Sequence, residues 1–352
     1  SSDLKRSTKR RIQAISGQAE VGYNNMAFLT LRARNDWSST LPVDNNSYFY
    51  PAVEGAFVMT ELPFLKGNKS IPYLKIRGAW AQVGKDAGPL EINPELEASD
   101  RTGGGYKYGY TGPNLALKPE MTTSWETGFE GRFLNDRIVA DFTYFRTYCD
   151  DQIVKGFRTS YAGGFVLNTQ NMGNFKTWGW EAHIDGDVIN NNSMRWNIGL
   201  NLSHTGSKVT YMPTPEVYDA YTFGNTAGVR NGAMVGYPLT TITGTDFQRN
   251  NKGQILIDPK SGFPLVSDQY SVLGDRQPEI RFGINTTLTY KGFRLSAMFA
   301  GMTNATVVNG TKRYMMQQGL SWESVDLRES GPVIFNGVLK DGNENTEKPT
   351  PN

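Results

Sequence analysis

Residues 178–203 read WGWEAHIDGDVINNNSMRWNIGLNLS, and nearly every second residue on either side of the central Asn run is apolar. Trp178, Trp180 and Ile184 lie on the first arm, Trp196 and Leu200 lie on the second, and mainly polar residues or glycines stand between them. Because successive side chains on a strand point to opposite faces, this alternation predicts a hairpin with one apolar and one polar face. Both arms exceed the length of a typical soluble strand.

The same alternation recurs elsewhere in the chain. Residues 126–147 alternate around Asn135-Asp136, and residues 278–301 alternate around Lys291-Gly292, turn pairs whose residue types tolerate the backbone angles of tight hairpins. Weaker pairs lie at residues 12–23 with 26–37 and at residues 50–59 with 73–83. The sequence therefore predicts about ten long antiparallel strands.

Long strands with one apolar face, one polar face and aromatic residues near their ends are typical of transmembrane β-barrels, whose strands cross lipid in about 9–11 residues. The predicted fold class is all-β, an antiparallel transmembrane β-barrel segment. The mean hydropathy of −0.47 agrees, because half of each such strand faces water. No apolar run is long enough for a transmembrane helix.

Charge and cysteine content exclude some classes of function. The formal net charge of +2 argues against a dedicated nucleic-acid binder. The single cysteine, Cys149, cannot form an intrachain disulfide, and we expect it to be an inert packed residue. The chain opens on a polar, basic stretch without a signal peptide and ends on a polar stretch, so we interpret it as an interior fragment.

The predicted connections alternate in length. Short ones at residues 24–25, 67–70, 135–136, 190–192 and 291–292 alternate with long ones at 38–47, 86–121, 150–174 and 209–277. Barrels of this kind carry short turns on one rim and long extracellular loops on the other, and long loops are usually functional or disordered. We expect residues 1–302 to form barrel strands with long extracellular loops, and residues 303–352 to form an extracellular loop or a disordered tail.

Nine short motifs together resemble the barrel of the SusC/RagA-like TonB-dependent outer-membrane transporters. They are NDWSSTLP (35–42), FYPAV (49–53), LKIRG (74–78), PNLALKPE (113–120), WETGFE (125–130), NMG (171–173), GWE (179–181), GD (274–275) and YKGF (290–293). Each is weak alone, but their order and spacing are specific, and they cover most of residues 12–302. One departure is Thr177, where the family commonly has Asn.

The resemblance implies a barrel of about 22 strands, of which this chain supplies fewer than half, without the plug domain or the closing strands. It implies a bacterial outer-membrane location in lipid and energised import of oligomeric nutrients, most often glycans and sometimes peptides. It also implies two protein partners: a SusD-like surface lipoprotein and the TonB complex, which would be contacted through the missing N-terminal part.

No residue pattern indicates an enzyme. The chain has no nucleophile elbow, phosphate-binding loop or His-Glu-x-x-His motif. Glu126 and Glu130 share a strand face, but we expect them to be lumen residues balanced by Arg132 rather than a glycosidase pair. His183 and His204 are too few ligands for a zinc site. We therefore expect no catalytic residue, metal or cofactor.

We expect the functional residues to be ligand contacts in the long connections. Aromatic rings beside amides suit sugar or peptide recognition, and three tyrosines with period two follow a Gly-rich segment at residues 103–105; the same tyrosines could instead fill space between packed loops. The candidate contacts are Trp37, Tyr106, Tyr108, Tyr110, Tyr161, Asn168 and Tyr221.

Alternatives from other classes remain. A soluble extracellular β-sandwich or propeller that binds carbohydrate would pack the apolar faces of its strands against a second sheet. A passive porin or an adhesive outer-membrane protein would keep the barrel but lack a plug. A secreted glycosidase is a more distant alternative.

Overall fold

The computed structural model describes residues 9–93, 96–99, 103–158, 165–213, 216–219, 228–329, 333–346 and 349. The chain divides into two compact units. The first comprises residues 1–215, 235–237 and 279–303, and the second comprises residues 216–234, 238–278 and 304–352. Among the described residues, the helices are too short and too polar to cross a membrane.

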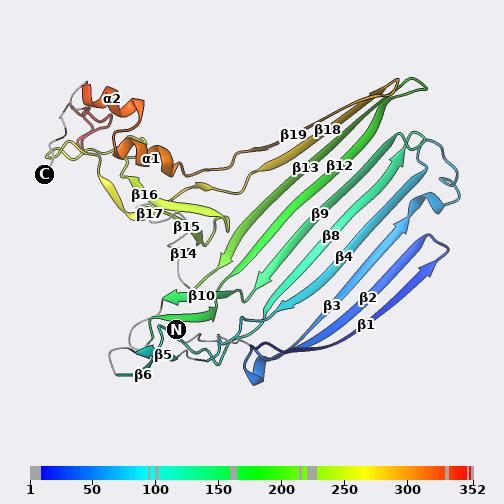
Figure 1. Cartoon of the computed structure of the whole chain (residues 1–352), viewed down its shortest axis with the longest axis horizontal. Coiled ribbons are helices and arrows are strands. Elements are labelled where there is room, and N and C mark those ends of the chain that lie inside the picture. The colour runs from blue at the N-terminus through cyan, green and yellow to red at the C-terminus, as the bar shows by residue number, and fades with distance from the viewer. Residues whose placement is uncertain are drawn as a thin grey trace. The chain divides into compact units, whose positions relative to one another are not determined.

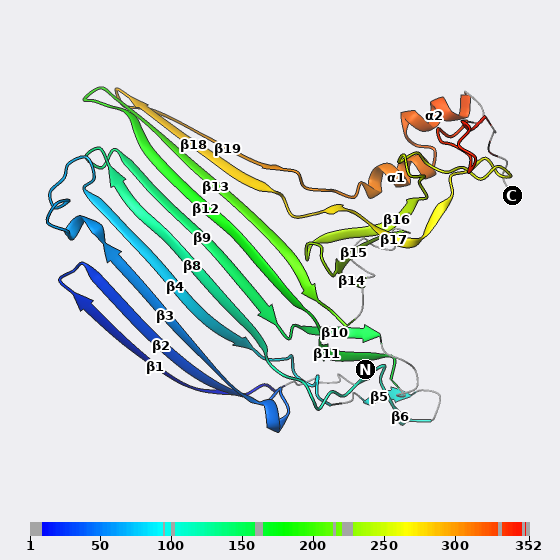
Figure 2. The ribbon, with the colours of Figure 1, turned by 180° about the vertical axis from the view of Figure 1, so that it is seen from behind.

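A sheet of ten long antiparallel strands dominates the first unit (Figure 1). Its strands, in spatial order, are β1 (Ile12–Tyr23), β2 (Ala27–Ser38), β3 (Ser47–Val58), β4 (Tyr73–Lys85), β8 (Glu120–Phe133), β9 (Ile138–Asp150), β12 (Asn174–Asn190), β13 (Met194–Tyr211), β18 (Ile280–Tyr290) and β19 (Phe293–Thr303). Each long strand pairs with the long strand next to it in the sequence, so the sheet is a meander. Figure 2 shows the same order from behind. The prediction of about ten long antiparallel strands is confirmed.

The register assigns every strand residue to one of two faces. Leu31 on β2 pairs with Val53 on β3, Phe129 on β8 with Phe142 on β9, and Leu200 on β13 with Ile284 on β18. Because pairing residues share a face and faces alternate along a strand, one face of the sheet is mainly apolar. We name it the outward face, and the opposite, polar face the inward face.

Aromatic residues on the outward face gather near both ends of the strands. Tyr23, Trp196, Tyr290 and Phe293 lie next to the hairpin turns, and Trp37, Phe49, Trp80, Trp125 and Trp178 lie toward the other end. Trp125 is 56% exposed and Phe293 is 82% exposed. Transmembrane barrels carry a girdle of aromatic residues at each membrane interface, and these two groups of aromatic residues match that arrangement.

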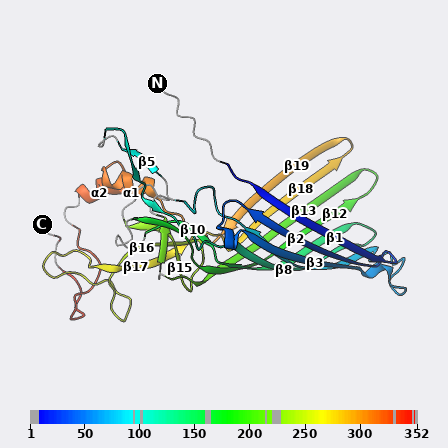
Figure 3. The same cartoon turned by 90° about the horizontal axis from the view of Figure 1, so that it is seen from below.

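The two ends of the strands carry different connections. At one end lie the connections 24–26, 59–72, 134–137, 191–193 and 291–292, and Figure 3 shows these turns gathered together. We name this end the short-turn rim. At the other end, the long-connection rim, lie residues 39–46, 86–119, 151–173 and 212–279. Four connections at the short-turn rim have two to four residues, as predicted, but the predicted short turn at residues 67–70 is part of connection 59–72, which is longer than connection 39–46 at the other rim.

The long connections contain structure that the alternation did not predict. Within the first unit they hold η1 (Val43–Asn45), the pair β5 (Leu96–Ser99) and β6 (Gly105–Tyr108), and a small sheet of β7 (Thr111–Gly112), β10 (Ile153–Arg158) and β11 (Leu167–Asn171). At the short-turn rim, η2 (Met59–Glu61) opens the longest turn. These elements are short, so no period in the sequence reveals them.

The second unit has its own small sheet. Strands β14 (Glu216–Asp219), β15 (Val229–Met234), β16 (Thr241–Phe247) and β17 (Val266–Asp275) pair in chain order. Ile242 and Ile257 are almost fully buried in this unit. Two short helices, α1 (Gly310–Gln317) and α2 (Trp322–Glu329), also belong to it. The predicted connection at residues 209–277 therefore contains four strands.

Candidate functional site

Charged side chains on the inward face form ion pairs between β4 and its neighbour β8, and between β4 and β9, the next strand beyond β8. Lys75 Nζ lies 2.7 Å from Glu130 Oε2. Arg77 donates two hydrogen bonds to Asp141, at 2.8 and 3.0 Å, and one of 2.6 Å to the hydroxyl of Thr143. The inward face is therefore charged. The two parallel hydrogen bonds from the Arg77 guanidinium to the Asp141 carboxylate hold these two side chains in a fixed geometry.

One prediction about this face needs correction. Glu126 and Glu130 do share the inward face, as predicted. The cation that neutralises Glu130 is Lys75 on β4, however, and Arg132 instead lies with its guanidinium 5.7 Å from the ring centre of Tyr73. The error arose because cross-strand partners come from a strand distant in sequence, whereas the prediction considered only neighbours on the same strand.

A shallow hollow of about 350 Å³ opens on the inward face over β9, β12, β13 and β18. Its lining includes Glu181, His183, Asn201 and Arg281, and His183 Nδ1 lies 2.8 Å from Asn201 Oδ1. Among the described residues, neither Glu181 nor Arg281 has an ion-pair partner. The hollow therefore offers an unpaired carboxylate and an unpaired guanidinium to a polar group in the lumen.

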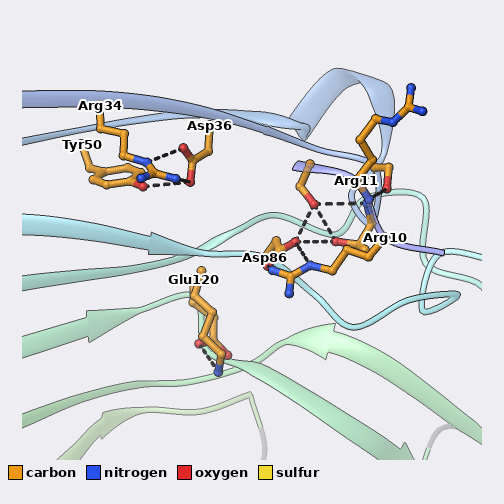
Figure 4. Close-up of polar contacts among 11 residues, drawn as sticks. Arg10, Arg11, Arg34, Asp36, Tyr50, Asp86 and Glu120 are labelled. Carbon is orange, nitrogen blue, oxygen red and sulfur yellow. Dashed lines mark hydrogen bonds and ion pairs between the residues drawn. The ribbon is translucent and has the colours of Figure 1, made fainter. Parts of the chain in front are cut away.

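Asp86, directly after β4, holds three segments together at the long-connection rim (Figure 4). Its carboxylate accepts hydrogen bonds from Arg10 Nε at 3.0 Å and from the hydroxyls of Ser38 and Thr40. Its side chain is 4% exposed, whereas that of Arg10 is 46% exposed. Burial alone would raise the pKa of Asp86, but the bonds from Ser38, Arg10 and Thr40 outweigh it and hold the pKa below its usual value.

Two more carboxylates, the buried Glu120 and the partly buried Glu91, fasten the long connections in the same way. Glu120 accepts hydrogen bonds from Lys85 Nζ at 3.1 Å and from the backbone N–H of Ile153 at 2.8 Å. Glu91 accepts a hydrogen bond of 2.6 Å from the hydroxyl of Thr169 and pairs with Lys155. Connections 86–119 and 151–173 are thus tied to each other by charge-assisted bonds.

Another polar group, centred on Asp36, lies on the inward face near the same rim. Asp36 accepts hydrogen bonds from Arg34 Nε at 2.7 Å and from the hydroxyl of Tyr50 at 2.8 Å (Figure 4). Next to it, Leu41, Tyr48, Ala87 and Leu117 form a small buried apolar cluster. The rim is therefore a packed platform that can present exposed side chains in fixed positions.

Three predicted contact tyrosines are exposed on this platform. Tyr106 and Tyr108 lie on β6 and are 73% and 64% exposed, and Tyr110, just after β6, is 62% exposed. The ring of Tyr108 meets Phe165 edge-on at 5.7 Å, and Lys107 Nζ lies 5.6 Å from the ring centre of Tyr110. Their exposure leaves ring faces open to a ligand.

The structure brings a fourth predicted residue close to these tyrosines. The carbonyl oxygen of Tyr110 accepts hydrogen bonds from the backbone N–H groups of Val166 and Leu167, and Asn168 on β11 pairs with Gly112 on β7. Asn168 Oδ1 is buried and has no hydrogen-bond partner among the described residues. Tyr161 and Tyr221 lie outside the described residues.

Trp37 lies apart from this group. It pairs with Gln13 on β1 and Ser47 on β3, so it lies on the outward face. Asn35 and Phe49 are its neighbours on that face. There it is one of the outward aromatic residues that lie near the long-connection rim. Its role as a ligand contact stays a prediction, and its placement favours a role at the lipid interface.

No sequence pattern pointed directly to the three carboxylates Asp86, Glu91 and Glu120. Asp86 and Glu120 each stand at the end of an alternating segment, and Ser38 and Thr40 lie in the motif at residues 35–42, so strand ends followed by hydroxyl residues are the available clue. His183 lies on the inward face and His204 on the outward face. In the described part of the chain, no three His, Cys, Asp or Glu residues are grouped to hold a metal ion.

Comparisons with known proteins agree with this architecture. A family model described as "TonB dependent receptor-like, beta-barrel" matches residues 1–326. The TonB-dependent receptor P26 of Formosa agariphila is 26% identical over 85% of this chain and 32% of its own length. The TonB-dependent receptor SusC of Bacteroides thetaiotaomicron is 24% identical over 82% of this chain and 31% of its own length. The chain thus spans about a third of these relatives.

A solved structure of the RagAB peptide transporter has a similar fold. It superimposes with a TM-score of 0.73, covering 97% of this chain and 39% of that chain, at 18% identity. A second structure, of the RagAB peptide importer in its "closed-closed" state, gives a TM-score of 0.67 over 84% of this chain. At 18% identity, this similarity shows a shared fold and nothing more.

Proposed function

The chain belongs to the TonB-dependent receptor-like β-barrel family of outer-membrane transporters, and we propose on this premise that it forms part of the barrel wall of an importer for oligomeric nutrients. The observation that carries the proposal is the sheet itself. Its apolar outward face and charged inward face suit a wall between lipid and an aqueous lumen. Because translocation requires no covalent step, the residues that matter bind ligand or hold the wall in place.

We propose glycans rather than peptides as the nutrient. Tyr106, Tyr108 and Tyr110 support this choice, because exposed rings beside amide and hydroxyl groups suit the apolar faces and polar edges of sugars. The small sheet of β7, β10 and β11 would hold those rings beside Asn168. The RagAB structures carry the word peptide in their descriptions, and peptides are the competing ligand class.

Two partners belong to the proposal. A SusD-like surface lipoprotein would cover the long connections and share the ligand with them, and the long-connection rim would then be extracellular. The TonB complex would supply energy through a part of the protein outside this chain. Residues 303–352 would belong to the extracellular side, like the connection before β18.

Uptake by the full-length protein in its outer membrane tests the proposal. Cells that lack the gene and carry either the wild-type protein or a Tyr106→Ala/Tyr108→Ala/Tyr110→Ala variant would be given fluorescent oligosaccharides or peptides of matched size. We expect energy-dependent uptake of oligosaccharides and a loss of affinity of about tenfold or more in the triple variant, because three ring contacts are removed. A Tyr290→Ala variant at the short-turn rim is the matched control.

Three outcomes would contradict parts of this function. Uptake of peptides but not oligosaccharides would reverse the ligand class. Uptake that persists after TonB is removed would indicate a passive porin. Unchanged affinity in the triple tyrosine variant would remove those residues from the binding surface while leaving the importer intact.

A further inference from the structure

Charged residues on the outward face of the ten long strands are confined to one place. The registers assign only Arg146, Asp150, Lys176 and Lys208 to this face among Asp, Glu, Lys and Arg residues of those strands. All four lie toward the long-connection rim, on β9, β12 and β13. A charged side chain on a lipid-facing surface is costly near the bilayer centre and inexpensive near its boundary, so their position indicates the boundary.

The three cations are close neighbours. Tyr148 on β9 pairs with Lys176 on β12, and Lys176 pairs with Lys208 on β13. Residues directly opposite on antiparallel strands have Cβ atoms about 5 Å apart, and diagonal neighbours such as Arg146 and Lys176 are about 7–8 Å apart. We name Arg146, Lys176 and Lys208 the cation cluster.

The cation cluster has no counter-charge in the described part of the chain. Neither lysine nor Arg146 forms an ion pair there, and Asp150, two residues after Tyr148 on the same face, forms none with them. Two lysines directly opposite each other destabilise a sheet unless an anion lies between them. Arg146 Nε is buried and has no hydrogen-bond partner among the described residues. A buried donor that is left without an acceptor costs free energy.

Aromatic residues surround the cluster. Arg146 pairs on its two sides with Trp125 and Trp178. Its guanidinium carbon lies 5.0 Å from the ring centre of Tyr148, and Lys176 Nζ lies 5.9 Å from that of Trp178. Rings that are apolar at one end and wet at the other are typical of the zone where lipid headgroups begin.

The depth of the cluster agrees with that zone. Arg146 stands eight residues after Ile138, where β9 leaves the short-turn rim. At about 3.3 Å per residue and a tilt of about 40°, this separation spans about 20 Å along the membrane normal, comparable with the apolar band of about 25 Å in such barrels. The cluster therefore lies near the upper edge of the apolar band.

We propose that the cation cluster binds the phosphate group of a membrane lipid in the leaflet next to the long-connection rim. A phosphate has oxygen acceptors for the Arg146 guanidinium and negative charge for both lysines. The lipid chains would extend along the apolar surface formed by Phe142, Ala182 and Leu202. This site is independent of the ligand and partners proposed above, because it faces away from the lumen.

Native mass spectrometry of the full-length protein, released from detergent, tests the site with phosphatidylglycerol and phosphatidylcholine as probes. We expect the wild-type protein to retain phosphatidylglycerol at least about tenfold more strongly, since phosphatidylcholine carries a cation beside its phosphate. A Lys176→Gln/Lys208→Gln variant should lose that preference. Lys291→Gln, which removes a lysine at the short-turn rim, is the matched control and should keep it.

Two further variants separate charge from folding. Arg146→Lys keeps the charge and should retain most of the preference, whereas Arg146→Gln should lose it with an unchanged elution volume. Equal retention of both lipids by the wild-type protein, or an unchanged preference in the double lysine variant, would overturn the proposal. If the double variant instead changes the oligomeric state, the cluster contacts a second copy of the chain rather than lipid.

Discussion

At the scale of single residues, Asp86 decides how the long connections are held. It accepts hydrogen bonds from Arg10 and from Ser38 and Thr40, so it joins its own segment to two others that are distant in sequence. A buried carboxylate with several donors is stabilised in its charged form, so the interaction survives although one partner, Arg10, is half exposed. Glu120 likewise joins two segments, because it accepts hydrogen bonds from Lys85 and from the backbone of Ile153.

We expect Asp86→Asn to loosen these connections without unfolding the sheet. The amide loses the charge and leaves Arg10 without its buried partner, and a broken bond to a charged group costs about 1.5–3 kcal/mol. Amide hydrogen exchange should accelerate around residues 38–46 and stay unchanged in β12 and β13. Lys66→Gln, which removes an exposed ion pair with Glu61, is the matched control, and equal exchange in both variants would contradict the role of Asp86.

The depressed pKa of Asp86 predicts an acid-sensitive rim. A group whose pKa is lower in the folded than in the unfolded protein stabilises the folded state when the pH is above the pKa of the unfolded protein, here 3.8. This stabilisation is lost as the pH falls through the pKa of the folded protein. Protection of residues 38–46 from hydrogen exchange should therefore be constant above about pH 5 and decrease at lower pH. In Asp86→Asn that acid-dependent part should be absent.

At the scale of elements, the β12–β13 hairpin shows how one strand serves two environments. Leu200 and Asn201 are adjacent on β13, yet Leu200 pairs with Ile184 and Ile284 on the outward face, and Asn201 pairs with His183 on the inward face. Adjacent residues on a strand thus have different environments, because they point to opposite faces of the sheet.

We expect Leu200→Arg to destabilise the membrane-inserted full-length protein by about 2–4 kcal/mol, the cost of a lipid-facing arginine near the bilayer middle. Asn201→Arg makes the same addition one residue later and should cost much less, because it faces the lumen. Equilibrium unfolding in lipid vesicles measures both variants. Equal losses of stability would contradict the assigned faces.

The long strands were predictable because their alternation is strong and local. Strand β1 begins and ends at the predicted residues, and β12 and β13 extend beyond the predicted hairpin at residues 178–203. The strand β8 begins at Glu120, six residues before its predicted segment, because Met121, Thr122 and Thr123 do not alternate clearly. Period-two patterns therefore predict the middle of these strands better than their ends.

The candidate site was less predictable. The tyrosines at residues 106–110 could be selected by composition, but the carboxylates Asp86, Glu91 and Glu120 and the cation cluster depend on which strands and connections are neighbours. Lys176 and Lys208 are 32 positions apart in the chain and face each other only through the register of β12 and β13. Such contacts depend on the register of strands, which cannot be predicted reliably from a single sequence.

At the scale of the molecule, the two faces predict a pattern of solvent accessibility in lipid. Nitroxide labels on the outward face of the full-length protein should contact oxygen dissolved in lipid, and labels on neighbouring inward residues should contact a water-soluble nickel reagent. The outward positions are Leu31, Val53, Phe129, Ile184 and Ile284, and the inward ones are Arg32, Glu54, Glu130, Asp185 and Asn285. Shielding of all outward labels would instead indicate a protein core.

The strand order of the sheet also has a consequence for how such walls change over evolutionary time. Each long strand pairs only with its neighbours in the chain, and each hairpin carries its own complete alternation. Duplication or loss of one hairpin would therefore leave the remaining pairings and both faces intact. A meander built in this way can change its circumference two strands at a time, which is consistent with the even strand numbers of bacterial barrels.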